Sequence, residues 1–250
     1  MIPAPEVALI AAAGILAGIV GSAGGITSLI SYPALLALGI PALPANVANN
    51  VSVTACWPGS ALASRPELQG TASWLRRWAG VTAAGGAIGA VLLLFTPPGA
   101  FSRVVPFLVA AGAITLLLQP RLSALRERQA HTSTAVFVAG LLLVSVYGGY
   151  FGAGSGVMTL SLVLLTVDQH LVRANALKNM LIGANTVTSA VIFIIFGPVD
   201  WAAVIPLSIG MFVGSMIGPR LARHIPANVL RWLVALLAMG LAVKLWIAPA

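Results

Sequence analysis

Charged residues, aromatic residues and cysteine are all scarce in this sequence. Only 7% of the 250 residues are Asp, Glu, Lys or Arg, whereas a soluble domain carries about 25%. So few charges do not cover a surface that faces water, which argues against a soluble enzyme, a disordered protein and a nucleic-acid binder. The single cysteine, Cys56, excludes a disulfide framework and a cysteine-based metal site.

Hydrophobic residues, in contrast, make up 59% of the chain, and the mean hydropathy is +1.02. At about 20 residues per spanning helix, the length allows roughly eight to ten membrane segments and no separate soluble domain. Glu6 and the absence of basic residues near the start make a cleaved signal peptide unexpected. We therefore predict an all-α polytopic membrane protein embedded in a lipid bilayer.

Breaks at proline, glycine and charged clusters divide the chain into apolar runs. These lie at 6–38, 47–64, 74–95, 101–119, 133–167, 172–196, 201–219 and 228–247. The runs 6–38 and 133–167 are too long for one span and too short for two. Each contains a glycine cluster, at 21–25 and 152–156. Each is therefore predicted to be a hairpin of a helix, a break and a shorter returning helix.

The basic residues favour this folding of the two long runs. If every run spans the membrane once, seven basic residues fall on one side and six on the other. If the two long runs are hairpins, eleven share one side, and only Arg103 and Lys244 lie opposite. Such an asymmetry is typical of cytoplasmic loops. We expect the basic loops to be cytoplasmic and both termini to lie on the outer face.

The two halves of the sequence resemble each other. Residues 21–29 align with 152–160, residues 45–50 align with 174–179, and Gly85 and Gly89 align with Gly210 and Gly214. The predicted repeats are 1–119 and 133–250, joined by a basic cytoplasmic linker at 120–132. Each consists of a broken-helix hairpin and three transmembrane helices, and five segments give the two halves opposite orientations. Inverted repeats with broken helices are typical of secondary transporters.

The two glycine breaks form the first candidate site. A helix that begins at a break has unpaired N–H groups and the positive end of its dipole, and both attract an anion. The candidate residues here are Ser22, Gly24, Gly25, Ser28, Gly154, Ser155, Gly156 and Thr159. The alternative is that these glycines only permit close helix packing. The symmetric pair of breaks favours a binding site.

Polar residues that follow each hairpin form the second candidate site. They are Asn46, Asn49 and Asn50 in the first half and Asn175, Lys178 and Asn179 in the second. Asparagine amides donate to an oxyanion without adding charge, although Asn46 and Asn175 suit a helix N-cap equally well. Lys178, which aligns with Asn49, either neutralises a bound anion or extends to the cytoplasmic surface.

Acidic residues are predicted only at segment ends or in loops, which disfavours a cation site built on a buried carboxylate. The three histidines also fall in loops, without metal-ligand spacing or a nucleophilic serine nearby. No catalytic residue, metal site or cofactor is therefore expected, and the chain is not expected to be an enzyme. The tryptophans, Trp57 among them, are interpreted as interfacial anchors.

Several ordered pieces of the sequence resemble the sulfite exporter TauE/SafE family. In the first half they are 24–29, 32–39, 45–50 and 57–60, and in the second half 150–154, 174–179, 199–201 and 214–220. The resemblance implies a bacterial inner-membrane permease for small sulfur-containing anions, such as sulfite, sulfonates or sulfoacetate. It also implies binding residues at the glycine breaks and at the Asn and Lys positions. The two halves differ where Asn49 aligns with Lys178.

The sequence thus predicts a secondary transporter of a small anion, with alternating access around a site between the repeats. The expected partners are this anion and the bilayer, with no nucleic acid. The alternatives are an anion channel, a permease for a non-sulfur organic anion and a membrane scaffold without transport activity. The sequence leaves the oligomeric state open, with a homodimer possible, because its 26 glycines suit packing within or between chains.

Overall fold

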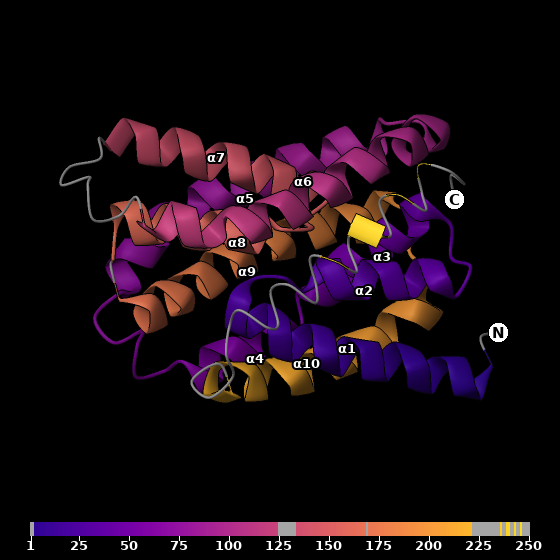
Figure 1. Ribbon diagram of the computed structural model, residues 1–250, viewed down its shortest axis with the longest axis horizontal. Helices are drawn as coiled ribbons and strands as arrows, with labels where there is room; N and C mark the ends of the chain where they lie inside the picture. The colour runs from indigo at the N-terminus through magenta and orange to yellow at the C-terminus, as the bar shows by residue number, and fades with distance from the viewer. Residues whose placement is uncertain are drawn as a thin grey trace.

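The structure, a computed structural model, describes residues 3–124, 134–168 and 170–221, together with Leu236, Met239, Gly240, Val243 and Trp246. Its continuous ranges form a helical bundle (Figure 1) in which the described residues include no strand. The helices are α1 (Ala4–Gly24), α2 (Ser28–Ala37), α3 (Ala42–Val53), α4 (Cys56–Ala63), α5 (Ala72–Leu94), α6 (Pro98–Ala124), α7 (Thr134–Tyr150), α8 (Ser155–Thr166), α9 (Leu171–Phe196) and α10 (Trp201–Leu221). By length and composition, α1, α5, α6, α9 and α10 are able to cross a membrane. The predicted all-α class is confirmed.

Both long apolar runs are broken helices, as the glycine clusters predict. α1 and α2 are separated by a turn at Gly25, which has φ 80°. α7 and α8 are separated by Gly152 and Gly154, each with φ 84°. Positive φ strains a residue that carries a Cβ, so glycine fits these turns. The second helix is the shorter one in each pair, with 10 residues after 21 and 12 residues after 17.

The run predicted at 47–64 forms two helices, α3 and α4, rather than one. Pro58 explains the break, because proline has no N–H to donate to the Thr54 carbonyl four residues earlier. The N–H of Trp57 donates to that carbonyl instead, at 3.1 Å. α9, which aligns with α3 and α4 in the second half, is continuous over 26 residues.

The end of α6 lies within the predicted linker, since the helix continues to Ala124. The rest of that linker, 125–132, lies outside the described residues, and the predicted segment 228–247 is described at only five positions. The structure therefore shows α9 and α10 as the segments that follow the second hairpin. The division of the chain into repeats at 119 and 133 remains a prediction.

Glycines bring α1 against α10. A Cβ on Gly14 would lie 2.5 Å from the Leu207 carbonyl oxygen, and one on Gly18 would lie 2.5 Å from the Met211 carbonyl oxygen. Because the paired residue numbers rise together, the two helices run parallel. Such close backbone approach through small residues is the usual way that membrane helices associate.

α5 and α7 pack in the same manner. A Cβ on Gly85 would lie 2.5 Å from the Ser145 Cβ, and one on Gly89 would lie 2.9 Å from the Gly149 carbonyl carbon. In the predicted repeat α1 corresponds to α7 and α10 corresponds to α5, so the prediction relates one packed pair to the other. α5 also packs on α9, as α10 packs on α3 and α4. These matched contacts support the proposed repeat.

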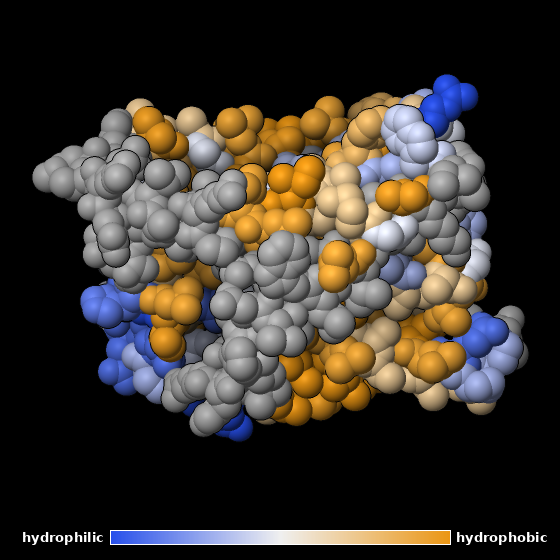
Figure 2. All heavy atoms as spheres, viewed as in Figure 1, coloured by the Kyte–Doolittle hydropathy of each residue, from blue (hydrophilic) through white to orange (hydrophobic). Residues whose placement is uncertain are grey.

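The two ends of the bundle differ in charge. α7 and α9 begin, and α10 ends, at the left of Figure 1, whereas α1 and α6 begin at the right. Arg65, Arg76, Arg173 and Arg220 belong to helix ends or connections on the left, and Arg103 lies near the start of α6 on the right. Figure 2 shows a broad apolar band between the ends on the visible face, as expected of a surface that contacts lipid.

Candidate functional site

The two helix breaks meet in the interior of the bundle. A Cβ on Gly25 would lie 2.5 Å from the Gly156 carbonyl carbon, and a Cβ on Gly156 would lie 2.5 Å from the Gly25 Cα. No side chain fits between these backbones, so the first turns of α2 and α8 begin next to each other. The glycine clusters, 131 positions apart in the sequence, therefore form one structural feature.

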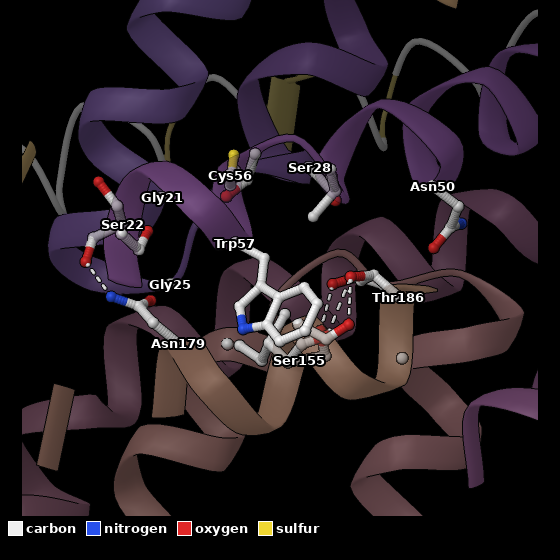
Figure 3. A pocket seen from close by; sticks show the side chains of 18 residues that line it. Gly21, Ser22, Gly25, Ser28, Asn50, Cys56, Trp57, Ser155, Asn179 and Thr186 are labelled. Carbon is white, nitrogen blue, oxygen red and sulfur yellow. Dashed lines mark hydrogen bonds between the residues drawn. The ribbon is translucent and has the colours of Figure 1, made fainter. Parts of the chain in front are cut away.

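A cavity of about 40 Å³ lies at this meeting point (Figure 3). Its lining comes from both halves of the chain and includes serine, threonine and asparagine side chains. The predicted site residues that line it are Ser22, Gly25, Ser28, Asn50, Ser155, Gly156 and Asn179. The predicted residues outside its lining are Gly24, Asn46, Asn49, Gly154, Thr159, Asn175 and Lys178. Thr159 lines a smaller adjoining cavity of about 10 Å³ together with Ser155.

Hydrogen-bond donors at the start of α2 and α8 are available to a ligand in this cavity. Within the described residues, the N–H groups of Ser28 and Gly156, which both line the cavity, have no backbone acceptor. The Ser28 hydroxyl accepts a hydrogen bond from Asn49 at 2.9 Å, which leaves its own proton free. The Ser155 hydroxyl, in contrast, donates to the Gly152 carbonyl at 2.7 Å.

The asparagines bind carbonyl groups that the helix breaks leave without an intrahelical partner. Asn175 and Asn179 donate to the Ser22 carbonyl at 2.9 and 3.1 Å, near the end of α1. In the other half, Asn46 donates to the Tyr150 carbonyl at the end of α7, at 2.9 Å. The asparagines therefore join each broken helix to the opposite half. Their second amide N–H groups remain for other partners.

Asn49 and Lys178 align in sequence but have different partners. Asn49 contacts Ser28 and Ser31 of α2, within its own half. Lys178 is fully buried, and its Nζ lies 3.3 Å from the Gly21 carbonyl oxygen at the end of α1. Among the described residues, Lys178 forms no ion pair. A buried lysine is thus positioned beside the cavity wall.

Trp57 and Thr186 also line the cavity, although the sequence analysis did not select them. Trp57 was interpreted together with the other tryptophans as an interfacial anchor, because most of them lie near the ends of apolar runs. It aligns with Thr186 at the same offset, 129 positions, that relates Asn50 to Asn179. Since neither residue was selected from the sequence, this alignment did not identify Trp57 as a site residue.

Acidic side chains lie away from the cavity. The described ones, Glu6, Glu67, Asp168 and Asp200, occupy helix ends or connections, and none is among the lining residues. Within the described residues, no three His, Cys, Asp or Glu side chains gather as a metal site would require. The cavity therefore offers hydrogen-bond donors and the partial positive charge of the two helix N-termini to a ligand.

Comparison with known proteins places the chain among membrane transporters. The family described as Sulfite exporter TauE/SafE matches residues 8–245. The chain is 28% identical to the probable membrane transporter protein ORF9 of Sinorhizobium sp. over 95% of this chain and 91% of that protein. It is 25% identical to the probable membrane transporter protein YfcA of Escherichia coli K12, over 92% and 86%.

A probable membrane transporter protein of Haemophilus influenzae is also 25% identical, over 95% of this chain and 93% of that protein. No solved structure matches the chain. The family match covers far more than half of the chain and agrees with the apolar helices described above. The protein is thus a multi-pass membrane transporter that belongs to the sulfite exporter TauE/SafE family.

Proposed function

We propose that the cavity between the two helix breaks binds a small anion, which the protein carries across the membrane by alternating access. The observation that carries this proposal is the contact between Gly25 and Gly156, which brings the N-terminal ends of α2 and α8 to one cavity. Both helix dipoles direct their positive ends there, and an anion compensates the unpaired N–H groups. A cation would face the same dipoles without a carboxylate in the described lining.

Lys178 supplies the formal positive charge in this proposal. It lies behind Gly21, whose backbone lines the cavity, and a low-dielectric interior transmits its field to a bound anion. Asn50 and Asn179 line the cavity from opposite halves and present amide groups to the anion. Taken with the family's description as sulfite exporters, this chemistry favours a sulfur oxyanion as substrate.

Alternating access would come from movement of two packed helix units against each other. The pairs α1 with α10 and α7 with α5 form these two units, each of which combines helices of both halves, and the units meet at the breaks. The hydrogen bonds from Asn175 to Ser22 and from Asn46 to Tyr150 cross between the halves, so they are the contacts that such a movement changes.

We further propose that the protein lies in the bacterial inner membrane with its basic end in the cytoplasm, following the positive-inside rule.

A thermal-shift experiment on the purified protein in detergent tests anion binding. The panel contains sulfite, sulfate, thiosulfate, sulfoacetate, taurine and acetate. A ligand at one hundred times its Kd stabilises the folded state by about 2.7 kcal/mol, so the true substrate class raises the unfolding temperature selectively. The K178M variant is the control, because its response to the same anion should be smaller. An unchanged unfolding temperature with every anion would contradict the proposal.

A further inference from the structure

The indole of Trp57 forms one wall of the cavity. Trp57 is the second residue of α4, and its ring lies directly on the backbone of α9 at Gly183. A Cβ on Gly183 would collide with the Trp57 ring, lying 2.7 Å from Nε1 and closer still to Cγ and Cδ1. Figure 3 shows the ring in the centre of the view, among the side chains of Ser28, Ser155 and Thr186. The absence of a side chain at Gly183 therefore allows the ring to occupy this place.

The space that remains beside the ring is small. The cavity volume of about 40 Å³ is the space open to the centre of a water molecule. Since one water needs roughly 10–15 Å³ by this measure, the cavity holds about three water-sized groups. This space is comparable with the oxygens of a compact oxyanion and is small for an anion that also carries a carbon arm.

Trp57 differs from the other lining residues in two respects. It is 40% exposed, whereas the remaining lining residues are buried or half-buried. Its counterpart in the second half, Thr186, is small and 5% exposed. The bulky wall is therefore present in one half only.

We infer that Trp57 determines specificity by setting the upper size limit of the anion, so that compact oxyanions enter and organosulfonates with a carbon arm are excluded. This inference rests on the proposed function of the same cavity. Among the described residues, no hydrogen bond from the indole N–H is found, and an indole nitrogen acts only as a donor. The ring therefore also offers a hydrogen bond to the anion that it admits.

Transport by protein reconstituted in liposomes tests the size limit. The measured quantity is the rate for sulfoacetate divided by the rate for sulfite, so that changes in protein amount cancel. The W57A variant should raise this ratio at least about tenfold, and W57L, a milder change, should raise it less. W57F should keep the ratio near the wild-type value while raising the KM for sulfite, because its ring fills the wall without an N–H. W201A removes an exposed tryptophan at the start of α10, outside the cavity, and should leave the ratio unchanged.

The outcomes separate this inference from the proposed function. Folding of each variant is checked by gel filtration in detergent, and W57L provides the ratio if W57A does not fold. An unchanged ratio in a folded variant that still transports sulfite would overturn the size limit and leave the proposed function intact. Failure of the wild-type protein to transport any of these anions would overturn both.

Discussion

The ammonium of Lys178 donates a hydrogen bond to the Gly21 carbonyl oxygen, 3.3 Å away, and so joins α9 of the second half to the end of α1 in the first. The side chain is fully buried, and no described carboxylate forms an ion pair with it. A buried charge is costly unless a partner compensates it. The anion that we place in the adjoining cavity is such a partner, whereas a purely structural role would be served by an uncharged residue.

Replacement of Lys178 by methionine separates binding from stability. Because an apolar residue of similar volume often replaces a buried charge without loss of stability, the K178M variant should unfold at the wild-type temperature or higher. Its Kd for the oxyanion should rise at least about tenfold, or 1.4 kcal/mol, as measured by ligand titration of the purified protein. R173M is the matched control, since Arg173 is exposed on the same helix and pairs with Asp168 at 3.3 Å. Equal affinities of K178M and the wild type would remove Lys178 from the site.

Adjacent glycines at the first break provide a second matched comparison. Gly25 has φ 80° and touches Gly156, whereas a Cβ on Gly24 would have no atom within 4 Å. A residue with a side chain in the left-handed region costs about 1–2 kcal/mol before any collision is counted. We expect G25A to lower the unfolding temperature and abolish transport, and G24A to retain both. Similar behaviour of the two variants would show that the contact between the breaks is not required.

The glycines at the contact between α1 and α10 are expected to affect the stability of the protein only through helix packing. A Cβ on Gly210 would collide with the Ala11 carbonyl and would lie 2.9 Å from the Ile15 nitrogen, whereas one on Gly80 meets nothing within 4 Å. Overpacking of a close contact typically costs about 1–3 kcal/mol. G210V should therefore lower the unfolding temperature in detergent, while G80V should leave it unchanged. A stable G210V protein would contradict the helix contact described here.

The orientation in the membrane is testable with single cysteines. Gly99 lies at the start of α6, and Gln69 lies in the connection before α5 at the opposite, basic end; both are exposed. In intact cells, a maleimide reagent that does not cross the membrane should label G99C and not Q69C. The native Cys56 is buried, so the wild-type protein gives the background. Labelling of Q69C alone would place the basic end outside and contradict the assigned orientation.

Patterns of small residues in the sequence allowed the helix breaks to be predicted. A glycine cluster inside an over-long apolar run has few structural interpretations, and both clusters are the predicted turns at Gly25 and at Gly152 to Gly154. The split between α3 and α4 was not predicted, although Pro58 is its cause. The effect of a single missing N–H on a helix depends on the packing around it, which the pattern of apolar residues does not contain.

The candidate site was only partly predictable from the sequence. The asparagines were selected as donors to an anion, and the structure shows that Asn46, Asn175 and Asn179 also bind main-chain carbonyls of the opposite half. Their partners lie more than one hundred residues away, so a local pattern did not reveal them. Trp57 was missed because the tryptophans were interpreted together as interfacial anchors, and only its three-dimensional position against Gly183 shows otherwise.

The most direct test of the central claim is counterflow of radiolabelled sulfite in liposomes that contain the purified protein. The vesicles are loaded with unlabelled sulfite and diluted into a small concentration of the labelled anion. A carrier that alternates access at one site should accumulate label transiently above its equilibrium level, and K178M should lose this accumulation. Label that only rises steadily to equilibrium would indicate a channel, and label that does not enter would contradict sulfite transport altogether.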